Sequence, residues 1–277
     1  DDLSHEDFLS IIRLIESYVF RRAVCAIPTN SLNKTFATFY KVINKEKYLE
    51  SIQVHFMNLP SYRRFPNDDE FKRELKVRDL YNFRSRSYWL RRLENDKRRE
   101  RVEEFTIEHI MPQNENLSAK WREELGSDWQ RVHKELLHTL GNLTLTRYNS
   151  RYSDRPFAEK RDIEDGFKHS PLYLNIGLGQ CEKWDEAAIR ARADRLADLA
   201  VQVWQAPALS EEVLAVYRGQ PENKTSYSLS DYPFLADGSH SRVLFDHLRD
   251  EVMRLDAGIT QEVLKLYIAF KAETNFV

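Results

Sequence analysis

The sequence predicts a mainly helical protein with a small α+β core, followed by a second, truncated α+β domain. Three observations lead to this prediction. Apolar residues recur at helical spacing through much of the first hundred residues, and again in the alanine-rich stretch before residue 204. Two short segments rich in strand-forming residues lie between these helical parts. With 277 residues, of which 42% are hydrophobic and 31% are charged, the chain is long enough to bury a substantial core.

The first expected element is a helix over residues 3–25. Ser4 and Asp7 have the spacing of a capping box at its start. Its apolar residues form one stripe that can pack against the rest of the protein: Phe8, Ile11, Ile12, Ile15, Tyr18 and Val19. After a loop over residues 58–69, the stretch from Asp69 to about Glu104 reads as one long helix.

The end of that long helix is strongly basic, although the whole chain has a net charge of -2. Between Arg84 and Arg101 there are eight Lys or Arg residues against three acids, and Tyr88 and Trp89 lie among them. Two interpretations stay open. The run can be a solvated helix face with Trp89 turned to the core, or it can be a surface that contacts phosphate groups.

Two short strands are expected after residue 104. Residues 105–111 favour a strand that Pro112 ends, because proline has no N–H for the ladder. A polar, helical insertion over residues 117–138 leads to a turn at Gly141 and Asn142. A second strand over residues 143–146 and a helix from residue 156 to about residue 167 complete the order strand, long connection, strand, helix.

An acidic residue and a His stand together before a Pro, as Glu108, His109 and Pro112, and Asn142 lies at the turn before the second strand. With Asn149 after that strand, this pattern resembles the HNH, or ββα-metal, nucleases. More closely, "EHIMPQ" and "LGNLTLTRYNSRYSDRPFAEKR" resemble the C-terminal nuclease domain of the GmrSD-type family of modification-dependent restriction enzymes. The resemblance covers about residues 69–204, and the HNH domain of the RNA-guided CRISPR nucleases shares "H-I-x-P-Q" and "N-x-x-L-T-R".

The resemblance implies a ββα-metal (HNH) nuclease motif embedded in a helical domain. We therefore expect four parts, with a linker at residues 205–210 before the last one. They are a helical region at 1–104, the nuclease core at 105–168, a helical continuation at 169–205 and a small accessory α+β domain at 206–277.

Hydrolysis of a phosphodiester needs a base for water and a counter-charge for the phosphate oxygens. His109 is the expected general base, because an imidazole accepts a proton near neutral pH. Glu108 and Asn149 are the expected ligands of a divalent metal, Mg²⁺ or Mn²⁺, because both offer oxygen atoms. Asp154 competes with Asn149 for the second ligand position, and Glu108 alternatively pairs with an Arg. By resemblance, Asn142 braces the loop that carries the base.

Seven arginines are candidates for contacts with DNA phosphates. Three surround the second motif and four lie in the basic run: Arg147, Arg151, Arg155, Arg91, Arg92, Arg98 and Arg99. Lys160 and Arg161 are expected to face solvent. His138 is expected to be a structural hydrogen-bonding group.

Composition also limits the compartment and the partners. Two distant cysteines supply neither a C-x-x-C zinc site nor a disulfide framework, so we expect a reducing, cytoplasmic setting with no membrane span. None of the eight glycines forms a Walker or dinucleotide loop. The resemblance implies DNA as the substrate and an upstream sensor domain in the same, longer polypeptide. Two alternatives remain, a catalytically inactive DNA-binding module and an RNase on the same scaffold.

Overall fold

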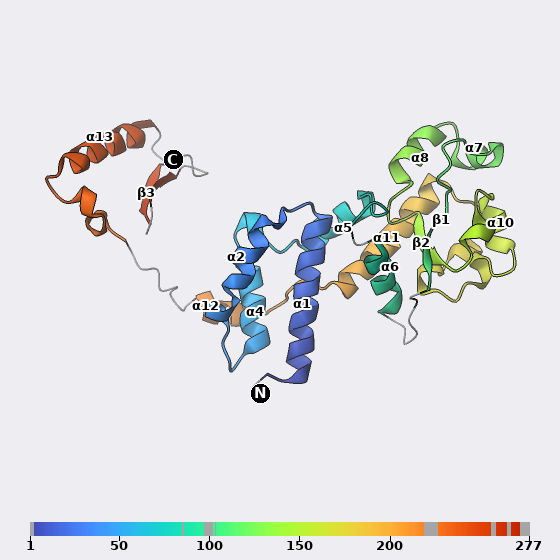
Figure 1. Ribbon diagram of the computed structural model, residues 1–277, viewed down its shortest axis with the longest axis horizontal. Helices are drawn as coiled ribbons and strands as arrows, with labels where there is room; N and C mark the ends of the chain where they lie inside the picture. The colour runs from blue at the N-terminus through green and yellow to red at the C-terminus, as the bar shows by residue number, and fades with distance from the viewer. Residues whose placement is uncertain are drawn as a thin grey trace. The chain divides into compact units, whose positions relative to one another are not determined.

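The computed structural model describes residues 3–84, 86–96, 102, 104–218, 227–255, 259–264 and 267–271. Within these ranges the chain is mainly helical, as predicted, and it contains two separate two-stranded sheets (Figure 1). The chain forms two compact units, residues 1–214 and residues 215–277. In the described ranges, no helix combines the length and the apolar character that crossing a membrane requires.

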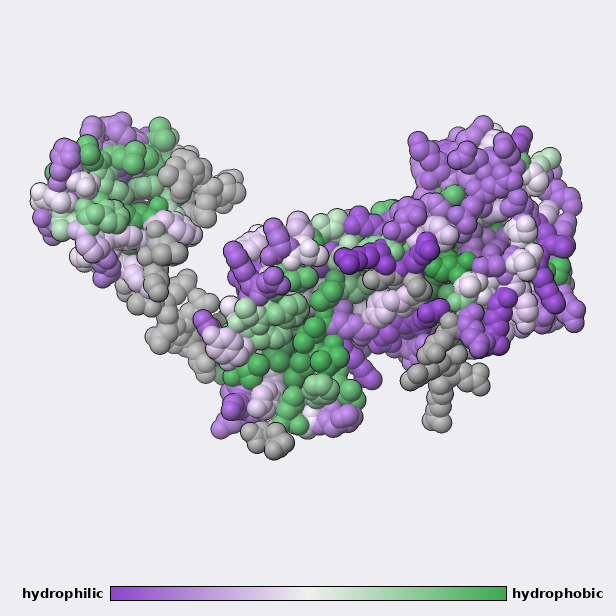
Figure 2. Space-filling model, in the orientation of Figure 1, coloured by the Kyte–Doolittle hydropathy of each residue, from purple (hydrophilic) through white to green (hydrophobic). Residues whose placement is uncertain are grey.

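The chain begins with a group of helices around α1 (His5–Val24). Ser4 caps this helix as predicted, because its side chain accepts a hydrogen bond from the backbone N–H of Asp7 (3.0 Å). The apolar stripe of α1 packs on α4 (Tyr48–Met57), and α2 (Leu32–Ala37) and α3 (Phe39–Val42) complete the group. The stripe is not fully covered, since Phe8, Ile12 and Val19 are exposed. Figure 2 shows hydrophobic surface over this group of helices.

The single long helix expected from Asp69 to Glu104 is wrong. The structure has two helices, α5 (Asp68–Val77) and α6 (Arg86–Asn95), with an irregular segment between them. The helix breaks because backbone groups find other partners there. Asp79 accepts from the N–H of Asn82 (2.9 Å), and the N–H of Leu80 donates to the distant carbonyl of His138 (2.9 Å). Residues 97–101 lie outside the described part of the chain.

The main core lies around α11 (Glu186–Val203), which packs against α5, α6 and α8 (Trp129–Leu136). Buried Arg192 on α11 stabilises this junction. Its guanidinium donates to the carbonyls of Gly141 (2.7 Å), Leu143 (2.9 Å) and Leu174 (3.1 Å), and also to that of Leu140. These bonds hold α11 against the second strand and against the short 3₁₀ turn at Tyr173–Asn175.

The predicted strand pair is present. Strand β1 (Thr106–His109) pairs antiparallel with β2 (Leu143–Thr146), with His109 opposite Leu143. β1 is shorter than the expected strand over 105–111, because Ile110 and Met111 turn toward Asn142 and bond its backbone and side chain. The connection between the strands contains α7 (Ala119–Leu125) and α8.

Two short helices follow β2, namely α9 (Asn149–Tyr152) and α10 (Phe157–Asp162). The helix expected from residue 156 to about residue 167 ends early. Ile163 is already extended (φ −61°, ψ 159°), and Asp165 has a left-handed φ of 62°, so the helix does not continue. A 3₁₀ turn at Phe167–His169 and another at Leu178–Gln180 then lead toward α11.

The second unit is smaller and has a small core. Helix α12 (Glu211–Arg218) spans the boundary between the two units. Helix α13 (His240–Leu255) precedes the antiparallel strands β3 (Thr260–Val263) and β4 (Ile268–Lys271). Val252, Ile259 and Phe270 form its buried cluster, while several apolar side chains of α13 are exposed.

Candidate active site

Glu108 and His109 are adjacent in β1 and both are buried, with 7% and 4% of their surface exposed. Neighbouring residues of a strand project to opposite faces. Glu108 accordingly contacts α10, and His109 contacts the segment between α5 and α6. The structure therefore places the two central residues of the motif on one strand but in two different surroundings.

On the first face, Glu108 pairs with Lys160 of α10. The ammonium of Lys160 lies 2.7 Å from Oε1 of Glu108 and donates to the carbonyl of His109 at 3.0 Å. Burial raises the pKa of Glu108 and lowers the pKa of Lys160, and each charge offsets part of the other's shift. The alternative that Glu108 pairs with a cation is thus realised, with a lysine in place of an arginine.

The expectation that Lys160 faces solvent is wrong, because its side chain is completely buried. Lys160 follows Phe157 by three residues on α10, and both side chains are buried on the same helical face. Arg161, on the next position, is partly buried and donates to the carbonyl of Cys181 (2.9 Å). The i,i+3 spacing from Phe157 is the signal in the sequence that indicates an inward position for Lys160.

On the second face, His109 lies among rings. Its Nε2 is 3.0 Å from Nδ1 of His138. The ring of Tyr81 meets His109 edge-on, with centroids 4.5 Å apart, and stacks on His138 at 5.1 Å. Burial above all, together with the charges of His138 and Lys160, lowers the pKa of His109 to about 3. The imidazole of His109 is therefore neutral at pH 7, but with this lowered pKa it is a weaker base than the imidazole near its ordinary pKa that the sequence led us to expect.

Asn142 links the loop after β1 to the turn before β2. Its Oδ1 accepts from the N–H of Met111 (2.7 Å) and from the indole of Trp184 (3.1 Å), and its Nδ2 donates to the carbonyls of Met111 (3.0 Å) and Leu137 (2.9 Å). Asn142 is fully buried. These four hydrogen bonds hold the loop after β1 in place. They use the amide of Asn142 fully, so it has no direct role toward a substrate.

Of the two competing ligand candidates, Asn149 has an oxygen without a partner. Its Nδ2 donates to Oγ1 of Thr106 (2.7 Å) and to the carbonyl of Ile107 (3.1 Å). Because a carbonyl only accepts, the amide cannot be turned round, and Oδ1 is the atom left over. Oδ1 is buried and receives no hydrogen bond from the described part of the chain. Asp154, in contrast, is exposed and accepts from Asn114 (2.8 Å).

These oxygen atoms fit a hard divalent cation. Among the described residues, no three His, Cys, Asp or Glu side chains gather into a metal-binding group. Mg²⁺ does not need such a group, because it keeps several waters and takes one or two protein oxygens together with substrate phosphates. The carboxylate of Glu108 and the unsatisfied Oδ1 of Asn149 are oxygens of the kind that Mg²⁺ takes, since Lys160 bonds Oε1 of the carboxylate and each oxygen has two lone pairs.

Residues 65–199 match the family model for the C-terminal domain of GmrSD restriction endonucleases. This part of the chain belongs to that family. The matched residues include β1, α10 and most of α11. The match confirms the family that the two motifs indicate. No curated protein and no solved structure matches the chain. We refer to residues 65–199 as the GmrSD domain. Its sequence relates it to restriction endonucleases.

Three of the predicted phosphate-binding arginines of the GmrSD domain lie on its surface. The side chains of Arg147, Arg151 and Arg155 are each 51% exposed. Arg151 pairs with Asp165 (3.1 Å), and the other two have longer contacts with Glu104 and Glu159. Exposed pairs of this kind are weak, so phosphate groups can replace the acidic partners.

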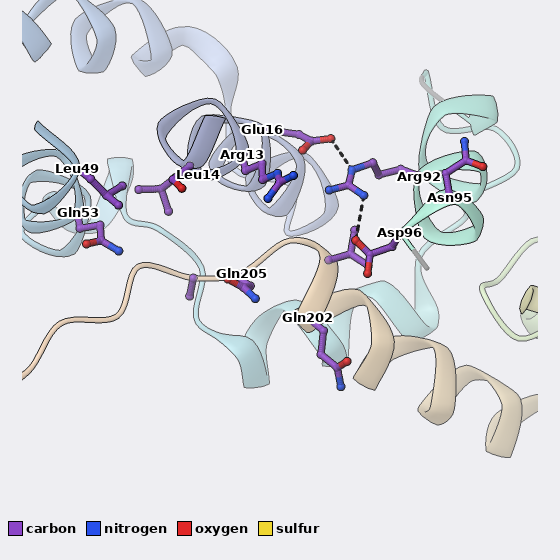
Figure 3. A pocket seen from close by; sticks show the side chains of 13 residues that line it. Arg13, Leu14, Glu16, Leu49, Gln53, Arg92, Asn95, Asp96, Gln202 and Gln205 are labelled. Atoms are coloured by element: carbon purple, nitrogen blue, oxygen red, sulfur yellow. Dashed lines mark hydrogen bonds and ion pairs between the residues drawn. The ribbon is translucent and has the colours of Figure 1, made fainter. Parts of the chain in front are cut away.

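The arginines of the basic run have different surroundings. Arg92 lies at a cavity of about 810 Å³ between α1, α4, α6 and the end of α11, where it pairs with Glu16 (3.1 Å) and Asp96 (3.2 Å) (Figure 3). Arg91 donates to the carbonyl of Phe105 (3.3 Å). Trp89 is fully buried, as one interpretation of the run required. Arg98 and Arg99 lie outside the described residues, and the role of the run in binding DNA stays a prediction.

Proposed function

We propose that the GmrSD domain is an HNH-type endonuclease that hydrolyses phosphodiester bonds of DNA with the help of Mg²⁺ or Mn²⁺. In this proposal β1, β2 and the following short helices form the ββα-metal motif, and the domain is the effector of a restriction protein whose sensor lies elsewhere in the polypeptide. The proposal depends mainly on the two different environments on the opposite faces of β1, in a domain of a restriction endonuclease family. A neutral, buried imidazole lies on one face, and oxygen donors lie on the other.

Besides binding the cation, the chain's own residues perform three tasks in this reaction. His109 accepts the proton of the attacking water, while one bond from oxygen to phosphorus forms and the bond to the leaving oxygen breaks. The leaving alkoxide takes its proton from solvent. Asn142 keeps the loop after His109 in place through Met111. Arg147, Arg151 and Arg155 attract the phosphates of neighbouring nucleotides.

Glu108 and Asn149 would hold the cation, with Asp154 as the competing ligand. When bound, the metal ion supplies a Lewis acid for the phosphate and the leaving oxygen. Lys160 fixes the position of the Glu108 carboxylate from the side opposite to solvent. The charge of Lys160 also reduces the repulsion between the buried carboxylate and a phosphate that approaches it.

One observation favours a second candidate function. The ammonium of Lys160 already neutralises Glu108, so a domain that binds DNA without cutting it would also be stable in this form. Cleavage and binding measured on the same preparation separate the two functions. DNA binding without cleavage at any divalent metal concentration supports the inactive binding module.

The deciding experiment is cleavage of supercoiled plasmid by the purified chain with Mg²⁺ or Mn²⁺. His109→Gln, which keeps much of the side-chain volume, should slow cleavage by about two to four orders of magnitude, the usual contribution of a general base. His5→Gln is the control, because His5 is exposed at the start of α1, outside residues 65–199. Full activity in His109→Gln contradicts the assignment. An RNA substrate cut faster than DNA would favour the RNase alternative.

A further inference from the structure

His138 is held in place from two sides at the position where it meets His109. Its backbone carbonyl accepts from the N–H of Leu80 (2.9 Å), and its ring stacks on Tyr81 with an interplanar angle of 13°. Both contacts come from the irregular segment between α5 and α6. The contact from Nδ1 of His138 to Nε2 of His109 is 3.0 Å, within the range of a direct hydrogen bond. The segment between α5 and α6, distant in sequence, thus fixes the ring of His138 toward His109.

A hydrogen bond between two ring nitrogens has one donor and one acceptor. A neutral imidazole carries a single N–H, so the donor in this bond decides which nitrogen of His109 keeps a lone pair. If His109 donates from Nε2, its Nδ1 is free to accept a proton. If His138 donates instead, the hydrogen of His109 sits on Nδ1 and His109 cannot act as a base through that nitrogen.

The proposed role of His109 selects the first arrangement. Nε2 of His109 lies 3.0 Å from Nδ1 of His138, so His138 occupies that nitrogen and Nδ1 of His109 is the one left to accept a proton from water. A neutral His109 that accepts at Nδ1 carries its hydrogen on Nε2 and donates it to Nδ1 of His138.

We propose that His138 is a positioning residue that accepts the Nε2 hydrogen of His109, so that Nδ1 of His109 is the nitrogen that takes the proton from water. This inference rests on the proposed function of His109 as the base. It assigns to His138 the task that a buried carboxylate performs in Ser-His-Asp hydrolases, where the wrong tautomer lowers kcat by about 10⁴-fold. Here the acceptor is Nδ1 of a second imidazole.

Two substitutions separate this task from simple packing. His138→Phe keeps an aromatic ring on Tyr81 but has no acceptor. His138→Asn loses the ring, but its Oδ1 lies near the position of Nδ1 and can accept. We expect His138→Phe to lower kcat for plasmid cleavage by at least about tenfold with KM nearly unchanged, and His138→Asn to retain most of kcat. The reverse order, with Phe active and Asn inactive, overturns the inference and makes His138 a packing residue.

The ¹⁵N spectrum of the histidine rings gives a test that does not depend on cleavage. In the parent protein at pH 7.5, His109 should show a protonated Nε2 and an unprotonated Nδ1. His138→Phe should shift His109 toward a mixture of the two tautomers. A spectrum with the hydrogen on Nδ1 of His109 in the parent overturns the inference. If the parent does not cleave DNA, the proposed function fails, whereas the spectrum still decides which nitrogen of His109 donates.

Discussion

On one face of β1, Glu108 meets the ammonium of Lys160, whereas on the other face, one residue later, His109 meets a second histidine and a tyrosine ring. Both side chains are buried to a similar degree. Burial raises the pKa of the Glu108 carboxyl against the pull of Lys160, and it lowers the pKa of the His109 imidazole. The same strand thus offers a charged pair on one side and a neutral base on the other.

Because of the pleat of the strand, two adjacent residues have chemically different surroundings. Adjacent residues cannot share one set of partners, because their side chains point to opposite faces. A nuclease needs both a counter-charge for phosphate and a base that is unprotonated at neutral pH. In the proposed function Glu108 would help to bind the cation that supplies the counter-charge, and His109 would act as the base from the opposite face of β1. Substitutions can test each face in turn, and then which face the DNA approaches.

The largest expected effect concerns the Glu108 face. Lys160→Met leaves a buried carboxylate without its cation, and breaking a buried pair in this way costs about 3–5 kcal/mol of unfolding free energy. Urea unfolding at pH 8 measures this decrease. The double variant Lys160→Met with Glu108→Gln should recover part of it, because no uncompensated charge remains. Arg161→Met is the neighbouring control. Equal stability of parent and Lys160→Met would mean that this face does not depend on the ion pair.

A smaller effect is expected from acid on the His109 face. Burial and nearby charges lower the pKa of His109 from 6.5 to about 3, so the unfolded chain binds this proton more tightly than the folded chain. Above pH 6.5 the protonation of His109 does not reduce the free energy of unfolding. As the pH falls from 6.5 toward 3, the free energy of unfolding decreases because the unfolded chain takes up the proton first. At pH 5 the decrease due to this residue is about 2 kcal/mol.

Unfolding in urea at pH 7.5 and at pH 5 checks this expectation. His109→Gln should lose less stability between the two pH values than the parent, because the group that titrates is gone. His169→Gln, at an exposed position, should behave like the parent. The same pH dependence in all three proteins would show that His109 is not held neutral by its surroundings.

The smallest effect concerns the DNA path. Asn149 bonds Thr106, which shares a face of β1 with Glu108, so we expect the arginines in and beside α9 to attract DNA phosphates to the Glu108 face. Replacing Arg147, Arg151 and Arg155 with Ala should weaken duplex binding on many sequences alike. The slope of log affinity against log salt concentration should flatten by up to about 0.9 for each phosphate that the variant no longer neutralises.

Arg91→Ala with Arg92→Ala serves as the comparison, since Arg92 is engaged by Glu16 and Asp96. We expect this double variant to keep the salt slope of the parent. Fluorescence anisotropy with a labelled duplex at several salt concentrations measures both slopes. A larger change in the double variant would place the DNA along α6, as the charge of the basic run suggests.

The sequence predicts the local features of this site well. The turn at Gly141 and Asn142 precedes β2, Pro112 follows the last residue of β1 by three positions, and Ser4 defines the start of α1. Each of these depends on residues within a few positions, whose effects on the backbone are general. The two strands of the β1–β2 pair and the mainly helical fold follow from local patterns in the same way.

The features that the sequence does not predict depend on distant partners. Lys160 turns inward to meet Glu108, 52 positions away, although a lysine is ordinarily exposed. The helix from Asp69 breaks because the N–H of Leu80 bonds His138. His138 in turn contacts His109, 29 positions away, and no local pattern marks that contact. Such pairs are decided by tertiary packing, which overrides the propensity of a single segment.

The guanidinium of Arg192 has a consequence for how this region opens and closes in solution. It bonds carbonyls on both sides of the turn before β2 and one in the 3₁₀ turn at Tyr173–Asn175. If either segment separated from α11 alone, the buried guanidinium of Arg192 would lose some of its hydrogen-bond acceptors. The two segments therefore unfold together with α11 as one cooperative unit. Their slowly exchanging amides should share a single opening free energy, distinct from that of α1 to α4.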